Sequence, residues 1–292
     1  MKKIQTLTLT MMMGAAVLSS CGDKKNAENA EGQEGAKTEA AAKPAMPADT
    51  KVYKSSDLTE KMPNEAANVA FDASVISTLD NLMEGNDKVE ALYFDHEYNM
   101  LGNASFKDCK NLKKVQFDAL VQVCGDYCFQ GCTSLTEAKL KTCTIGESCF
   151  DGCTSLEKVI LDDNGWNVRV SSLANCPNLK TVIVPQTLEI LEEGAFTGSK
   201  NIEELAVPYN FKDHIYTFVA EAKNIKKLYI LTPAYYSFPT KAAAKAFNKA
   251  QCEVYVPDAA IEDFKKDPNW AAFAAVKPLS ESGYFTADCH VK

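Results

Sequence analysis

Seven segments of this chain align beneath one another with similar residue types at each position, most of them 23 residues apart. The clearest pair is CFQGCTSLTEAKL at 128–140 and CFDGCTSLEKVIL at 149–161. One column of the alignment, with steps of 23, 23, 21, 23, 23 and 23, contains Asn86, Cys109, Cys132, Cys153, Cys176, Ser199 and Ala222. A period held over seven copies is typical of a repeat protein, in which each copy stacks on the next.

Each copy ends in a short apolar pattern such as Leu112, Val115 and Phe117, whose last part alternates as a β-strand does. One copy encloses too few apolar side chains to offset the entropy of ordering its backbone, so a copy is not expected to fold alone. Stacking covers each copy with the next one. The repeats therefore predict an α/β solenoid with a parallel sheet of short strands over residues 83–257, where the segment 252–256 is a degenerate eighth copy.

The cysteines of the repeats align with small residues in the other copies. Where two copies have Cys128 and Cys149, others have Ser105, Ser172 and Ala195. A tight corner needs only small side chains, whereas a metal site needs its particular ligands. We therefore expect a structural ladder of buried, reduced thiols, made of Cys109, Cys132, Cys153 and Cys176.

Two other roles for the cysteines stay open at this stage. Cys128, Cys132, Cys149 and Cys153 form two CxxxC pairs that could hold zinc, although no other feature supports it. Disulfides between equivalent cysteines of stacked copies are disfavoured, because parallel strands hold Cβ atoms about 4.8 Å apart, beyond the usual bridging distance. Cys252 and Cys289 lie outside the ladder and could pair, which spacing alone cannot show.

The pattern of an aromatic, two residues, Cys, two residues, Leu and a short strand resembles the BspA-like leucine-rich repeat family of bacterial surface proteins. It is matched by 106–117, 129–140 and 150–161, while Leu173 replaces the aromatic, and Ser199 and Ala222 replace Cys, in later copies. The resemblance implies a leucine-rich repeat solenoid, and adhesion or binding of host proteins as the leading function.

Both ends of the solenoid are expected to carry helical caps. In the N-terminal cap, 51–82, an amphipathic helix over 66–83 would place Val69, Ala73, Ile76, Leu79 and Met83 on one face. A C-terminal cap and tail, 258–292, would follow a helical segment that begins at Thr240. There Asp258 is the expected N-cap, Lys265 and Lys266 lie near the helix end, and the sealing residues are Ile261, Phe264, Trp270 and Phe273.

The N-terminus is typical of an exported lipoprotein. Residues 1–20 combine two lysines with a short apolar run and small residues, and the segment ending at Cys21 resembles the lipobox in which the cysteine is acylated. Residues 21–50 are mostly Ala, Glu, Lys and Gly, a composition that cannot bury a core, so a disordered tether is expected. These features predict a membrane-anchored protein of the cell envelope, on the outer membrane, with surface and periplasmic orientation left open.

Little in the sequence favours catalysis or nucleic-acid binding. The net charge is -8, and Arg169 is the only arginine, so the forks that grip phosphate are almost absent. His96, His214 and His290 lie in no metalloprotease motif and beside no evident nucleophile. Asp162, Asp163 and Asn164 lack the spacing of a calcium loop. We expect a non-enzymatic protein without cofactor or metal.

Side chains that point outward from the sheet suggest a binding surface. The expected outward column contains Tyr93, Gln116, Lys139, Ile160, Ile183, Ala206, Tyr229 and Tyr255, and Leu231 lies in the row beside it. Its second half is apolar, and an exposed apolar patch is typical of a docking site. We therefore predict that a protein or peptide binds over Ile160, Ile183, Tyr229, Leu231 and Tyr255, unless a cap, linker or second copy covers them or the strand phase is shifted by one. The alternative function is an accessory lipoprotein that captures glycans or peptides for uptake.

Overall fold

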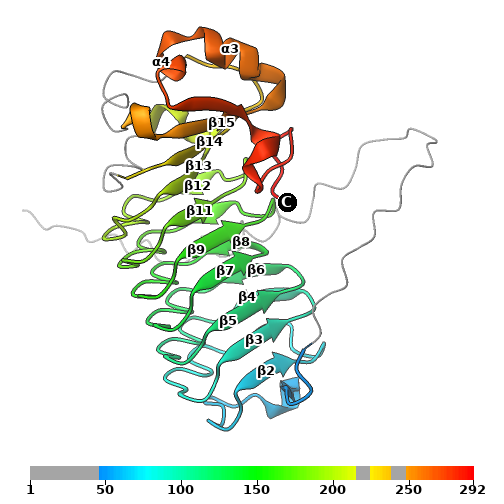
Figure 1. Ribbon diagram of the computed structural model, residues 1–292. Coiled ribbons are helices and arrows are strands. Elements are labelled where there is room, and N and C mark those ends of the chain that lie inside the picture. Colours follow the sequence, from blue (N-terminus) through cyan, green and yellow to red (C-terminus); the bar gives the residue numbers. More distant parts are fainter. Residues whose placement is uncertain (1–45, 215–223, 238–247) are drawn as a thin grey trace, which may run out of the picture. The chain divides into compact units, whose positions relative to one another are not determined.

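The repeats form two parallel β-sheets that share one stack of coils, each coil being one copy of the repeat (Figure 1). The computed structural model describes residues 46–214, 224–237 and 248–292. In spatial order, the eleven strands of the larger sheet are β1 (Lys51–Tyr53), β2 (Asn68–Phe71), β3 (Ala91–Phe94), β5 (Lys114–Phe117), β7 (Glu137–Leu140), β9 (Lys158–Leu161), β11 (Thr181–Ile183), β13 (Glu204–Pro208), β14 (Lys227–Leu231), β15 (Glu253–Val256) and β16 (Ala275–Pro278). This arrangement confirms the predicted solenoid and its parallel sheet of short strands.

A second sheet, which the sequence analysis did not anticipate, lines another side of the first coils. Its five parallel strands are β4 (Tyr98–Leu101), β6 (Val121–Cys124), β8 (Thr142–Ile145), β10 (Asn167–Val168) and β12 (Ile190–Leu191). In the five coils that contain β3, β5, β7, β9 and β11, the strand of the larger sheet is followed after a short turn by a strand of the smaller one, as β5 is by β6.

Each coil turns its corner through left-handed backbone. One left-handed position per coil is occupied by Asn81, Ala104, Tyr127, Ser148, Ser171 and Gly194, and a second, four residues later, by Gly85, Asp108, Gly131, Gly152, Asn175 and Gly198. L-residues adopt this conformation at a cost of about 1 kcal/mol, so its recurrence shows that the corner geometry outweighs residue preference. At the neighbouring column, Gly146 has no room for a side chain, because a Cβ there would lie 2.6 Å from the carbonyl carbon of Gly125 in the previous coil.

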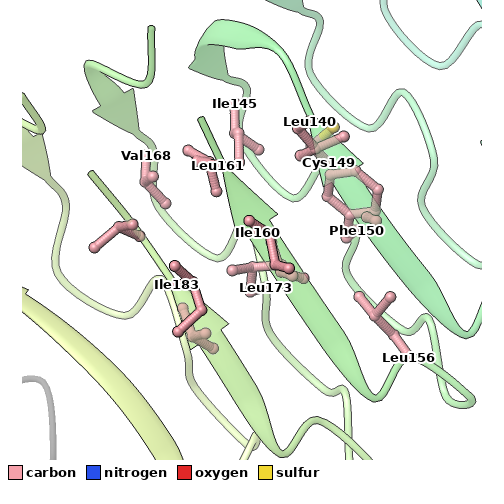
Figure 2. Close-up of a cluster of buried hydrophobic side chains, with 14 of the residues drawn as sticks. Leu140, Ile145, Cys149, Phe150, Leu156, Ile160, Leu161, Val168, Leu173 and Ile183 are labelled. Atoms are coloured by element: carbon pink, nitrogen blue, oxygen red, sulfur yellow. The ribbon is translucent and has the colours of Figure 1, made fainter. Parts of the chain in front are cut away.

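The core lies between the two sheets and the corners. Phe106, Phe129 and Phe150 are fully buried and stack in sequence, with ring centroids 5.4 and 5.2 Å apart. Figure 2 shows the part of this core around Phe150, where leucines and valines from neighbouring coils fill the remaining space. The aromatic residue at the same position of successive repeats therefore forms a continuous stack in the interior.

The predicted N-terminal helix over 66–83 is wrong. Residues 68–71 form strand β2, and turns follow it. Val69 and Met83 are buried as expected, but Ile76 and Leu79 are 58% and 43% exposed, which a sealing helix would not allow. Pairing with β1 and β3 satisfies the backbone groups of β2 and favours the strand. The larger sheet thus begins at Lys51, and the helical structure of the described residues before β2 is one 3-10 turn, Ser55–Asp57.

The C-terminal end is closed by short helices, as expected, and by one more strand. Helices α3 (Ile261–Lys266) and α4 (Pro268–Ala271) bury Phe264, Trp270 and Phe273, and β16 then pairs with β15. Ile261 packs against the same core. The expected N-cap at Asp258 is wrong: its carboxylate accepts hydrogen bonds from Ser280, at 3.1 Å from N and 2.5 Å from Oγ.

The remaining short elements are 3-10 turns. They span Tyr209–His214, Lys249–Gln251, Asp258–Ala260, which leads into α3, and Leu279–Ser282, which follows β16. Helix α4 is capped by Asp267, whose side chain accepts from the backbone N of Asn269 at 2.8 Å. Thr240 and the helical segment predicted after it fall within 238–247, outside the described residues.

Candidate binding surface

Strand pairing confirms the outward column that the sequence predicted. Tyr93, Gln116, Lys139 and Ile160 follow one another in register across β3, β5, β7 and β9, and Ile183 pairs with Ile160. Further along, Ala206 pairs with Tyr229 and Tyr229 with Tyr255. The strand phase is therefore correct, and these side chains leave the sheet on the face opposite the core.

The apolar half of this face is nevertheless covered, so the expected exposure is wrong. The side chains predicted as the ligand-binding surface are only 0–8% exposed. These five residues are Ile160, Ile183, Tyr229, Leu231 and Tyr255. Ile160 and Ile183, adjacent in Figure 2, belong to the same contiguous apolar cluster as Phe285 and Cys289 near the C-terminus. For Tyr229 the covering residues are known, because its ring contacts those of Tyr284 and Phe285, which follow the last strand.

Residues 284–292, called here the C-terminal segment, supply most of this cover. The ring centroids of Tyr284 and Phe285 lie 5.8 and 5.7 Å from that of Tyr229. Phe285 is fully buried. Figure 1 shows the red C-terminal segment beside the carboxyl ends of the strands, running from the end of the last strand toward the middle of the stack. Tyr255 is covered differently, by Tyr229 and by Lys277 of β16, whose Nζ lies 5.7 Å from its ring centroid.

Polar contacts fasten the other end of the C-terminal segment. Nδ1 of His290 lies 2.9 Å from Oδ2 of Asp163, and the backbone N of Val291 donates to Oδ1 of the same carboxylate at 3.1 Å. Nε2 of Gln186 lies 3.5 Å from the carbonyl oxygen of Asp288. Asp163, expected to form part of a simple turn, therefore contacts residues more than 120 positions later in the chain.

A carboxylate joins the C-terminal segment to the strands beneath it. Glu204 accepts from Nζ of Lys227 at 2.8 Å and from the hydroxyl of Tyr229 at 3.2 Å, and the Tyr284 hydroxyl also hydrogen-bonds to it. Burial raises the pKa of Tyr229 and of Tyr284, and the negative charge of Glu204 adds to both shifts. These hydroxyls stay protonated at neutral pH and act as donors.

The other half of the outer face is polar and open. Lys114, Glu137 and Lys139 are exposed on β5 and β7, and Lys158 on β9 is half-buried. Nζ of Lys158 lies 3.9 Å from Oε1 of Glu137, a surface ion pair of small energetic value. Alternating charge over three neighbouring strands leaves donors and acceptors available to a polar partner.

The cysteine ladder is buried, as predicted, and it also makes hydrogen bonds. Each Sγ lies 3.2 Å from a backbone carbonyl oxygen of the preceding coil: Cys109 from Met83, Cys132 from Phe106, Cys153 from Phe129, and Cys176 from Phe150. All four thiols are reduced and fully buried. Burial raises the pKa of Cys109 and Cys176 to about 12, so neither is a reactive thiolate at neutral pH.

The structure also tests the two other roles considered for the cysteines, zinc binding and disulfide formation. Within 46–214, 224–237 and 248–292, no three His, Cys, Asp or Glu side chains are grouped so that they could hold a metal ion. Cys252 and Cys289 are both reduced and do not pair. Cys289 lies 3.7 Å from the carbonyl oxygen of Thr232, so it too belongs to the contacts of the C-terminal segment. Cys21, the expected lipidation site, lies outside the described residues.

Two of the histidines make structural contacts. Nε2 of His96 lies 2.9 Å from the carbonyl oxygen of Val75, and its ring lies 4.2 Å from that of Tyr98. His290 holds Asp163, as described above, while the side chain of His214 lies outside the described part. In the described part of the chain, no helix is both long and apolar enough to cross a bilayer.

Comparison with protein families identifies the repeat. The model of the BspA type leucine rich repeat region matches in six copies, over residues 64–143 and 125–245. The chain belongs to the BspA-type leucine-rich repeat family. The match begins at residue 64, before the first of the seven aligned segments, in agreement with a larger sheet that already contains β2 there. A comparison with curated proteins finds no match.

Several solved structures are similar to this BspA-type chain. A leucine-rich repeat protein of T. pallidum is 17% identical, with 62% of this chain and 78% of that one covered and a TM-score of 0.43. A leucine-rich cell surface protein of Faecalibacterium prausnitzii is 10% identical, with 80% and 83% covered and a TM-score of 0.41. A leucine-rich repeat protein of Bacteroides ovatus is 16% identical, with 78% and 69% covered and a TM-score of 0.35.

Proposed function

We propose that this BspA-type protein is a non-enzymatic, lipid-anchored protein of the cell envelope that binds a protein or peptide through the outer face of its larger sheet, in adhesion or host interaction. The observation that carries the proposal is the in-register outward column, which lines up side chains from successive coils on one face. A row of this kind can follow an extended or folded partner over several coils.

The accessible part of that face is its polar half, which makes the proposal testable. Glu137 and Lys139 are both exposed and point outward from β7. Exchanging them, as Glu137→Lys with Lys139→Glu, keeps the net charge and inverts the local pattern. Because charge complementarity sets partner choice, we expect this variant to lose about tenfold or more in capture of a host protein.

A matched control exchanges exposed charges elsewhere. Lys110→Glu with Glu157→Lys also keeps the net charge, and both residues lie in the segments before the strands rather than on the outer face. Capture should match that of the unaltered protein. Equal capture by all three proteins would contradict binding through this face, and glycan binding on an array without protein capture would favour the alternative uptake function.

The proposed location needs its own test, because it depends on Cys21. The Cys21→Ser variant should lose attachment to membranes and the mass increase of acylation. Protease treatment of intact cells then decides orientation: digestion supports surface display, while full protection would exclude a role in adhesion.

A further inference from the structure

The C-terminal segment is not needed to close the end of the solenoid. The last coil is already covered by α3 and α4, whose Phe264 and Trp270 are fully buried, and the sheet already ends at β16. A further cap would be expected to stack on β16. Instead, the segment contacts Tyr229 on β14 and Asp163 in the turn after β9, both of which precede β16 in the stack.

The segment folds back on itself as a short hairpin, in which Phe285 bridges to Val291 and the backbone N of Lys292 donates to the carbonyl oxygen of Tyr284, and this hairpin packs on the solenoid. Its contacts run from Tyr229 on β14, through Thr232 and Gln186, to Asp163 after β9. It leaves the 3-10 turn Leu279–Ser282 at Gly283, whose φ is +82°. Glycine adopts this conformation without strain, so the segment departs from the solenoid at a point where the backbone can readily change direction.

The contacts form two groups: an apolar anchor, made by Tyr284 and Phe285, and a polar clasp, made by His290 and Asp163. Phe285 fills the outer face and is fully buried, and Tyr284 packs beside it against Tyr229. Beyond this pair, His290 is half-exposed while its ring contacts Asp163. A buried aromatic anchor with a polar rim is the organisation that protein and peptide interfaces use.

We propose that the outer face from β9 to β14 is a peptide-binding site that the chain's own C-terminal segment occupies in this structure. The inference rests on the proposed binding function and names the partner's chemistry: a protein segment with two adjacent aromatic side chains, followed a few residues later by an imidazole. The aromatic pair is held by Tyr229, and the imidazole by Asp163.

This arrangement has a direct consequence for affinity. A tethered segment competes at a high effective concentration, so the apparent Kd of an external peptide equals its intrinsic Kd divided by the fraction of molecules whose site is free. Tyr229, one of the residues predicted from the sequence as a ligand surface, is then reached once the segment is displaced.

The experiment weakens the docking of the C-terminal segment by substitution in the full chain and adds the same segment as a separate peptide. The probe is a fluorescent synthetic peptide of residues 283–292 with Cys289 replaced by serine, and binding is followed by polarisation. The Phe285→Asp protein, whose own segment no longer fits the apolar anchor, should bind the probe at least about tenfold more tightly than the unaltered protein. Adding Asp163→Ala should weaken that binding about tenfold, and a probe with Tyr284→Ala and Phe285→Ala should not bind.

A second variant separates docking from folding. His290 is half-exposed, so His290→Ala can loosen the clasp without disturbing the core, and it should raise probe affinity by a smaller factor than Phe285→Asp. If Phe285→Asp unfolds the sheet, as seen by circular dichroism, or if probe affinity is the same in all proteins, the segment is a permanent part of the fold and the proposal fails. Concentration-dependent dimers that exchange segments, with no probe binding, would also overturn it. None of these outcomes involves Glu137 or Lys139, so the proposed function is judged separately.

Discussion

The Oγ atom of Ser199 lies 2.7 Å from the carbonyl oxygen of Leu173 and accepts a hydrogen bond from the backbone N of Cys176 at 3.0 Å. Serine here takes the place that Cys109, Cys132, Cys153 and Cys176 take in earlier coils, where each thiol faces the corresponding carbonyl. In these five coils the position is therefore filled by a small side chain with a polar hydrogen, and sulfur as such is not required.

Ser199→Ala is expected to destabilise the fold by about 1–3 kcal/mol, because it leaves the buried N–H of Cys176 and the carbonyl of Leu173 without this partner. Ser199→Cys restores the residue found in other coils and should stay within about 1 kcal/mol of the unaltered protein. Urea denaturation at neutral pH measures both. A loss in Ser199→Cys as large as in Ser199→Ala would show that volume, not hydrogen bonding, decides the position.

The ladder thiols are expected to resist alkylation in the native protein. Cys109, Cys132, Cys153 and Cys176 are fully buried, and burial raises the pKa of each thiol. Mass spectrometry after iodoacetamide treatment at pH 8 should find all four unmodified, and all four modified in denaturant. As a control, Lys110→Cys introduces an exposed thiol that should react within the same time. Rapid native labelling of any ladder cysteine would contradict the structure.

Stability should fall in alkaline solution. The pKa of Cys109 is raised from 9.0 to about 12 by burial, so above pH 9 the unfolded chain releases a proton that the folded chain keeps. The contribution of each such thiol to the free energy of unfolding is therefore complete below pH 9. It is lost as the pH rises toward 12, by about 1.4 kcal/mol per pH unit. Cys109→Ser removes one titrating group. The unfolding free energy of this variant, measured from pH 8 to 10.5, should fall less steeply by that amount.

Replacing Gly146 or Gly152 by alanine should lower the stability by different amounts. At Gly146 a Cβ would lie 2.6 and 2.7 Å from backbone atoms of Gly125 and Asp126, so Gly146→Ala must separate two coils and should cost about 3 kcal/mol or more. At Gly152, where φ is +72°, a Cβ would meet nothing within 4 Å, and Gly152→Ala should cost only the 1–2 kcal/mol of left-handed alanine. Thermal unfolding compares the two. Equal losses would mean that the coils can move apart freely.

The repeat pattern predicted the sheet because its information is local and recurs. A leading leucine and an alternating strand in each copy determine which side chains face inward, and pairing of Lys139 with Ile160 confirms that phase. The second sheet was missed because β10 and β12 have only two residues each, too few to show an alternation. Helical spacing before the first copy was misleading because β2 is stabilised by its neighbours on both sides, which local spacing does not reveal.

The candidate site could be predicted only in part. Alternation shows which face Ile183 and Tyr229 are on, but not what lies over them, since the covering Phe285 follows Tyr229 by more than 50 residues. One signal was available: two adjacent aromatics, Tyr284 and Phe285, occur in an otherwise polar terminus, where solvent alone would not favour them.

The two outermost strands of the larger sheet limit assembly by edge pairing. β1 has three residues and exposes Lys51, which lies 3.7 Å from Glu65, and β16 ends at Pro278, which has no N–H to donate. Parallel solenoids risk growing into fibres when one copy adds its sheet to the end of another, and short, charged or proline-bearing margins oppose that growth. Molecules of this protein can thus be crowded together without their sheets joining end to end.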